Sequence, residues 1–68
     1  MADFQIVTTD GKCLTEGRSY YHFQDLGYDS PRLLSFGYDG DYVVLGFEHG
    51  LKLEIPEHNI KYIATKNA

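Results

Sequence analysis

The stretch that decides the fold is Asp41-Tyr-Val-Val-Leu-Gly-Phe47, followed by Glu48-His49-Gly50, Leu51-Lys-Leu-Glu-Ile55, Pro56-Glu-His-Asn59 and Ile60-Lys-Tyr-Ile-Ala64. We interpret these segments as a strand, a tight turn, a second strand, a short helical turn and a closing strand. Apolar residues alternate with Lys52 and Glu54, a pattern typical of a half-buried antiparallel strand. Pro56 cannot donate to a sheet, so it predicts the end of that strand and a single 3₁₀ turn at 56–59.

The strand that opens this stretch has a different pattern. Residues 42–45 are apolar on both faces, as in a strand that is covered on two sides or contacts a partner. We therefore expect this strand to lie in the centre of its sheet.

Turn signals divide the rest of the chain into short segments. Asp10-Gly11 lies between β-prone segments at 4–9 and 12–15 and predicts a type I′ hairpin, while Asp39-Gly40 predicts a second hairpin. The aromatic-rich segment 18–24 is interpreted as a further strand. Residues 25–32 form the longest loop. Ser30-Pro31 is also compatible with the start of a single helical turn, so both alternatives are kept for this segment. The chain is thus predicted to be all-β.

The order of hairpin, proline-initiated helical turn and short final strand resembles the second half of SH3-like small barrels, which include Sm-like, Tudor-like and KOW-type modules. The resemblance covers residues 33–64, and its sequence-level echo is Ile55-Pro56-Glu57-His58-Asn59-Ile60. It implies a small antiparallel barrel of five to six strands. Peptide-binding SH3 domains carry a tryptophan after the n-Src loop and a tyrosine three residues after the proline of the short helical turn. This chain has no tryptophan, and Asn59 stands where that tyrosine would be. A polyproline groove is therefore not expected.

Size and composition limit the architecture and its setting. A chain of 68 residues is expected to form one domain, residues 1–68, with a thin core. Cys13 is the only cysteine, so no internal disulfide forms. The chain shows neither a signal-peptide pattern nor an apolar run of membrane-spanning length. We expect a cytoplasmic protein without membrane contact.

Charge bears on the class of partner. The net charge is -4 and the isoelectric point is about 5.1, which opposes the basic surface that phosphate-backbone binders need. Nucleic acid is therefore a disfavoured partner.

Groups able to perform chemistry are scattered. His22, His49, His58 and Cys13 show none of the spacings typical of metal sites, and no flanking motif marks Cys13 as a nucleophile. The glycines lie singly at turns and form no phosphate-binding loop. We predict no catalytic residue, no metal and no cofactor.

Tyrosine is the residue type that stands out, with six copies. Aromatic rings are enriched in interface cores, and several aspartates are crowded near one arginine in the long loop. The predicted protein-binding residues are Tyr20, Asp25, Tyr28, Asp29, Arg32 and Tyr38. The alternative explanation is structural, because aspartate favours turns and tyrosine rings cover the ends of small barrels.

Three functions follow as hypotheses. The first is a non-enzymatic protein-binding or adaptor module of a small bacterial or phage-related type, with self-association to form a homo-oligomer left open. The second is a nucleic-acid-binding small barrel of the Sm, KOW or cold-shock kind, whose exposed aromatics would stack on bases. The third is an enzyme or ligand carrier, for which so small a barrel leaves little interior room.

Overall fold

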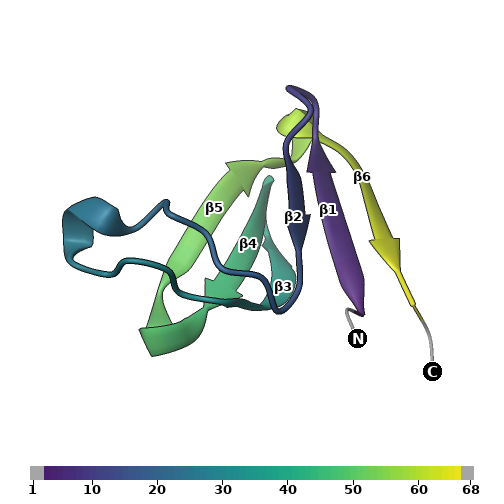
Figure 1. Ribbon diagram of the computed structural model, residues 1–68. Helices are drawn as coiled ribbons and strands as arrows, with labels where there is room; N and C mark the ends of the chain where they lie inside the picture. Colours follow the sequence, from purple (N-terminus) through teal and green to yellow (C-terminus); the bar gives the residue numbers. More distant parts are fainter. Residues whose placement is uncertain (1–2, 67–68) are drawn as a thin grey trace.

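The computed structural model describes residues 3–66 and contains two three-stranded antiparallel sheets (Figure 1). The first sheet has the strand order β2-β1-β6 and consists of β1 (Phe4–Thr8), β2 (Cys13–Thr15) and β6 (Ile60–Thr65). The second has the order β3-β4-β5 and consists of β3 (Leu33–Asp39), β4 (Tyr42–Phe47) and β5 (Lys52–Pro56). The connections contain three short 3₁₀ helices, η1 (Gln24–Leu26), η2 (Glu48–Gly50) and η3 (Glu57–Asn59). No α-helix occurs within residues 3–66, so the all-β prediction is confirmed.

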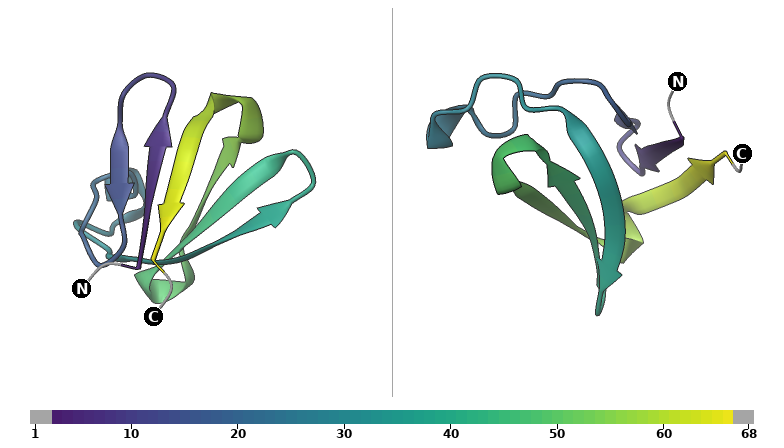
Figure 2. Two further views of the ribbon diagram at one scale, coloured as in Figure 1. Left: turned by 90° about the vertical axis from the view of Figure 1, so that its right-hand side faces the viewer. Right: turned by 90° about the horizontal axis from the view of Figure 1, so that it is seen from below.

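The core lies between the two sheets, which cross at a steep angle in Figure 2. Alternate residues of β1 and β4 point inward, as the period of two in a strand requires. The fully or nearly buried apolar residues are Phe4, Ile6, Leu14, Phe23, Leu33, Val43, Leu45 and Phe47. Both sheets and the long loop before β3 therefore contribute to a single core.

The predicted closure into one barrel is not found. β5 and β6 follow one another in sequence but belong to different sheets, because η3 lies between them and redirects the chain. Within residues 3–66, bridge pairing outside the six strands is limited to the isolated bridge between Ser19 and Arg32. Each sheet consequently keeps two edge strands, which a closed barrel would lack.

Both Asp-Gly hairpins form, but the first has a different turn from the one predicted. The β1–β2 hairpin is closed by the Thr8 amide, which donates to the Lys12 carbonyl oxygen at 2.9 Å. Within this loop only Gly11 has a positive φ (90°), so Asp10 does not adopt the left-handed conformation that a type I′ turn requires. The connection is a three-residue loop that ends in a left-handed glycine. The β3–β4 hairpin forms at Asp39-Gly40 as predicted, but Asp39 pairs with Tyr42, and of the two turn residues between them Gly40 (φ 60°) has a positive φ and Asp41 does not, so this turn is not type I′ either.

The type I′ condition is met instead between β4 and β5. His49 (φ 66°) and Gly50 (φ 73°) are both left-handed, and the Leu51 amide donates to the Glu48 carbonyl oxygen at 3.4 Å. The central position of β4, the half-buried pattern of β5 and the 3₁₀ helix after Pro56 are confirmed.

The strand predicted at 18–24 is wrong. Phe23 is buried in the core and begins the turn into η1, so its side chain rather than backbone pairing fixes this segment. Residues 25–32 continue as an irregular loop after η1, and no helical turn begins at Ser30-Pro31. None of the helices within residues 3–66 has the length and apolar character needed to cross a membrane.

Candidate functional site

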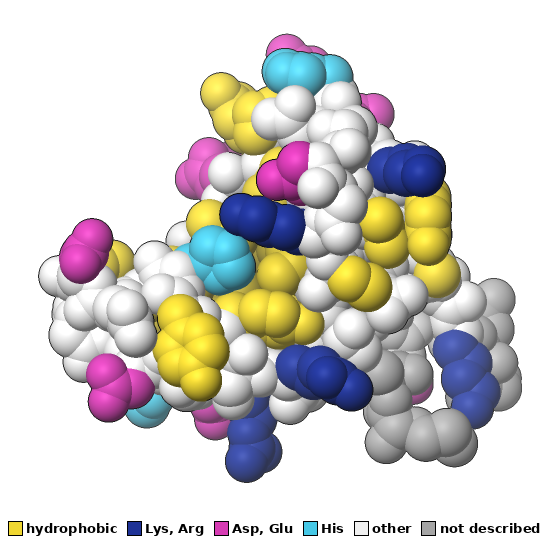
Figure 3. Space-filling view, turned by 45° about the horizontal axis from the view of Figure 1, so that its top comes forward, with side chains coloured by type: hydrophobic (Ala, Val, Ile, Leu, Met, Phe, Trp, Pro, Cys, Tyr) yellow, Lys and Arg dark blue, Asp and Glu magenta, His cyan; other side chains and the backbone are white. Residues whose placement is uncertain are grey.

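A cleft of about 340 Å³ opens where β2 and β5 diverge. Leu14 of β2 and Leu53 and Ile55 of β5 provide its apolar lining. The polar residues around them are Thr8, Thr9, Asp10, Lys12, His22 and Asn59. Figure 3 shows hydrophobic side chains gathered in a hollow on this face, with histidine and Lys or Arg side chains around it.

A second hollow of about 420 Å³ continues from the first. It shares Lys12, Leu14 and His22 with the cleft and adds Cys13, Tyr20 and Tyr21. Tyr21 is 67% exposed, so a large aromatic surface is available there. We call the two hollows together the inter-sheet groove. An apolar floor with polar groups around it is typical of surfaces that bind other molecules.

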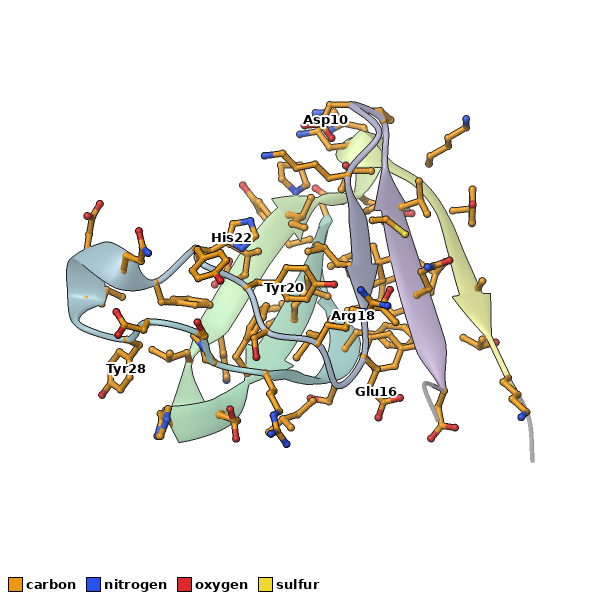
Figure 4. All side chains as sticks on the ribbon, viewed as in Figure 1. Asp10, Glu16, Arg18, Tyr20, His22 and Tyr28 are labelled. Carbon is orange, nitrogen blue, oxygen red and sulfur yellow. The ribbon has the colours of Figure 1, made fainter. Side chains whose placement is uncertain are left out.

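The edge of β2 that faces the groove is blocked by Tyr20. The Thr15 amide donates to the Tyr20 hydroxyl oxygen at 2.6 Å, and the carbonyl oxygens of Cys13 and Thr15 both lie 3.5 Å from that hydroxyl. The Tyr20 ring packs edge-on against Phe47, with ring centroids 6.4 Å apart. Figure 4 shows the phenol directed at β2. A single side chain thus occupies the position that an added strand would need.

The edge of β5 has no such plug. The Phe47 amide donates to Leu51 and the Glu57 amide donates to Asp41, both at 2.8 Å. Antiparallel ladders alternate hydrogen-bonded and non-bonded pairs, so these two bonds fix the phase of the whole ladder.

It follows that Lys52, Glu54 and Pro56 direct their backbone groups away from β4, since their partners in the register are the non-bonded ones. Within residues 3–66, no hydrogen bond outside the β4–β5 ladder involves residues 52–56. The amides of Lys52 and Glu54 are therefore unpaired donors beside the groove.

The other edges carry irregularities. The β3–β4 register shifts between Leu33 and Ser35, and the β1–β6 register shifts between Val7 and Thr8. Such bulges twist an edge strand and hinder the addition of another strand. The β4–β5 register is continuous from Tyr42 to Gly46. β5 is thus the regular, unplugged edge of the two sheets.

The β1–β2 turn forms one polar end of the groove. The buried Thr8 hydroxyl donates to the Asp10 carboxylate, and it accepts a hydrogen bond from the Lys12 amide at 3.1 Å. The bond from Thr8 lowers the pKa of the Asp10 carboxyl, because it favours the charged form; the Lys12 backbone and the Lys12 charge add to this effect. Asp10 therefore presents a fixed negative charge at this end of the groove near neutral pH.

The loop formed by residues 16–32, which we call the overhanging loop, borders the groove and projects beyond β5 (Figures 1 and 2). Phe23 anchors it against Phe47, with ring centroids 5.0 Å apart. Tyr28 stacks on His49 of the β4–β5 turn at 5.1 Å. Leu26, in η1, is 68% exposed. Together with the Tyr20–Phe47 contact, these aromatic contacts attach the loop, and the Leu26 side chain faces solvent.

Five of the six residues predicted to bind protein lie in this loop, and one does not. Asp25 and Asp29 are exposed, whereas the backbone of Arg32 is joined to Glu48 through its amide (2.9 Å to Oε1) and its carbonyl oxygen (3.0 Å). Tyr38 lies near the opposite end of β3, about 17 Å along the strand from Leu33. The structure therefore does not bring Tyr38 together with the other five, Tyr20, Asp25, Tyr28, Asp29 and Arg32.

Apart from Tyr20, the residues that form the groove were not predicted from the sequence. Alternation in 51–55 predicted the inward face of Leu53 and Ile55, but no pattern indicated that this face meets Leu14 at an open boundary between sheets. The unpaired backbone of β5 follows from the strand order, which side-chain patterning does not contain.

Chemically, the groove provides apolar surface, two free amides and separate charges. Within the described residues, no three side chains among His, Cys, Asp and Glu come together as metal ligands. Comparison with known proteins gives no match: no protein-family model fits the chain, and neither a curated protein nor a solved structure is significantly similar to it. Any function has to be inferred from this groove itself.

Proposed function

We propose that this chain is a non-enzymatic protein-binding module that takes an extended segment of a partner as an added strand on β5. The observation that carries the proposal is the free, regular edge of β5 beside an apolar groove. In this mode of recognition, backbone hydrogen bonds to the sheet edge give affinity, and pockets for alternate side chains give specificity.

The β5 edge supplies both requirements. The amides and carbonyl oxygens of Lys52 and Glu54 would bond the added strand, since both point away from β4. A partner residue opposite Leu53 would direct its side chain toward the groove, where Leu14 and Ile55 provide apolar contact. An apolar residue is therefore favoured at that position of the partner.

Lys52 and Glu54 also select the partner by charge. Their side chains share the outer face of β5, and residues directly opposite them in an added strand are close enough to attract or repel. An antiparallel partner with the order basic, apolar, acidic places its acidic residue opposite Lys52 and its basic residue opposite Glu54. We take this triplet as the recognition motif.

We propose that the chain shares with SH3-like barrels the order in which its strands are connected. Its first and last strands pair with each other, and a 3₁₀ helix joins β5 to β6. The single cysteine fits the cytoplasmic setting that we propose for this module. The nucleic-acid alternative has less support, because the chain carries 10 acidic and 6 basic residues.

The test uses a peptide library displayed on phage and selected on the immobilised protein. We expect enrichment of peptides with the basic, apolar, acidic triplet, and we expect these peptides to shift the NMR amide signals of Lys52 and Glu54. Glu54→Pro removes one outward amide without breaking a bond to β4, and it should abolish binding.

Tyr38→Pro is the matched control. By the same alternation, the Tyr38 amide faces away from β4 on the opposite edge strand, β3, so its loss should leave peptide binding intact. Circular dichroism checks that both variants remain folded. Peptides that bind Glu54→Pro as well as they bind the original chain would refute the use of this edge.

A further inference from the structure

We propose that the strand which β5 accepts most readily is β5 of a second copy, so that the chain forms a symmetric dimer with a continuous six-stranded sheet. This inference rests on the proposed function and names its partner. The sequence Lys52-Leu53-Glu54 is itself the basic, apolar, acidic triplet that the edge of β5 selects.

The register follows from the direction of the backbone groups. In an antiparallel pair of β5 strands, hydrogen bonds form only where outward-facing residues meet one another. The outward-facing residues are Lys52, Glu54 and Pro56, and only Lys52 and Glu54 have an amide to donate. One register places Lys52 of each copy opposite Glu54 of the other, with the two-fold axis at Leu53. Both outward amides of each copy are then bonded.

The competing registers are unfavourable. Pairing Lys52 with Lys52, or Glu54 with Glu54, also brings outward groups together but sets like charges directly opposite one another. The register centred on Leu53 instead forms two Lys–Glu pairs on the outer face. Charge thus selects a single self-complementary arrangement, as a two-fold interface requires.

The inner face of the same register is apolar. Leu53 would face its own copy across the axis, and Leu51 would lie opposite Ile55. All three are only partly buried in the single chain and pack against its core. Pairing would therefore remove further apolar surface from water beside the inter-sheet groove.

The overhanging loop supplies contact beyond the strands. It projects past β5 on the side where the second copy would lie (Figures 1 and 2), and it carries the exposed Leu26 and Tyr21. A stable interface generally buries at least about 1,200 Å² in total, more than five paired residues provide. Contacts from both loops would make up the difference.

The experiment exchanges the charges of Lys52 and Glu54 and follows mass by sedimentation velocity over a wide concentration range. Lys52→Glu or Glu54→Lys alone turns two attractive pairs into two repulsive ones, so each should weaken self-association about tenfold or more. The double variant Lys52→Glu/Glu54→Lys restores opposite charges and should dimerise like the original chain.

Mixing the two single variants gives the sharpest result. One copy then offers two glutamates and the other two lysines, so a heterodimer should form at concentrations where each variant alone is monomeric. Native mass spectrometry with one isotope-labelled variant detects it. Lys61→Glu, on β6 of the other sheet, changes the net charge as Lys52→Glu does. It lies away from the edge of β5 and should leave the dimer intact.

Several outcomes would overturn the inference: a monomer at all concentrations, a dimer unaffected by either single variant, or no heterodimer on mixing. None of these by itself removes the proposed function. If triplet peptides still shift the Lys52 and Glu54 amide signals of a monomeric chain, the edge binds a partner other than itself. If neither peptides nor a second copy reach β5, both proposals fail.

Discussion

Removal of the Tyr20 hydroxyl tests how the edge of β2 is blocked. In Tyr20→Phe the ring can keep its edge-on packing against Phe47 (6.4 Å), but the Thr15 amide loses the oxygen that accepts its hydrogen bond at 2.6 Å. A hydrogen bond of this type contributes about 1 kcal/mol net, and water can partly replace it at an edge strand. We therefore expect Tyr20→Phe to lower the free energy of unfolding by about 0.5–1.5 kcal/mol.

That loss is measurable in so small a domain. Stability scales at roughly 0.05–0.15 kcal/mol per residue, which gives about 3–10 kcal/mol for a chain of 68 residues. A change of about 1 kcal/mol lowers the Tm of such a domain by about 4–8 °C. Thermal and urea unfolding followed by circular dichroism give both quantities.

Hydrogen exchange assigns the loss to the proposed bond. The Thr15 amide should exchange faster in Tyr20→Phe, whereas the Glu16 amide, which donates to the Phe4 carbonyl oxygen at 3.1 Å, should change less. Tyr21→Phe is the matched control, because this neighbouring tyrosine is 67% exposed. An unchanged Tm together with unchanged Thr15 exchange in Tyr20→Phe would refute the plug.

Three further changes test the core, the acid dependence and the packing of the sheet. Leu45 is completely buried, so Leu45→Ala should lower the free energy of unfolding by about 2–5 kcal/mol; a loss below about 1 kcal/mol in urea titration would contradict its place in the core. The pKa of Asp10 lies below its ordinary value of 3.8, so its contribution is present above that pH and lost as the pH falls through the folded-state pKa. Asp10→Asn should therefore lower Tm near neutral pH, and this deficit should shrink as the pH falls below 3.8; a deficit that does not change with pH would exclude this linkage. Gly46→Ala would place a Cβ 2.6 Å from the Ser35 Oγ and should destabilise the fold, whereas Gly37→Ala meets nothing within 4 Å and serves as the control; equal Tm values for the two variants would contradict the contact.

The second half of the chain was predictable because its local signals agree with one another. Alternation in 51–55, the Asp39-Gly40 turn and Pro56 indicate element boundaries that agree to within about one residue with those of the structure. The turn at His49-Gly50 adds a case in which a non-glycine residue accepts a positive φ, which histidine tolerates better than most residues.

The structure of the first half of the chain was harder to predict, because its aromatic residues contact different parts of the fold. In 18–24, Tyr20 reaches back to β2 while Phe23 inserts into the core, so no single alternation describes the segment. Strand propensity favoured extension, but contacts with residues distant in sequence decided the outcome. Nothing local in the sequence records that Phe23 will meet Phe47.

The candidate site was likewise predictable only in part. Six tyrosines indicated an interface, yet Tyr20 blocks an edge and Tyr28 stacks on a turn, so the enrichment alone does not separate binding from structure. The free edge of β5 depends on a different property, the direction of backbone groups, which the strand order determines. η3 sends the chain to the other sheet, and β5 is left without a neighbour where a closed barrel would have paired it. The proposed binding edge therefore exists because the barrel is not closed. For the same reason Lys52 and Glu54 are free to select a partner strand by charge.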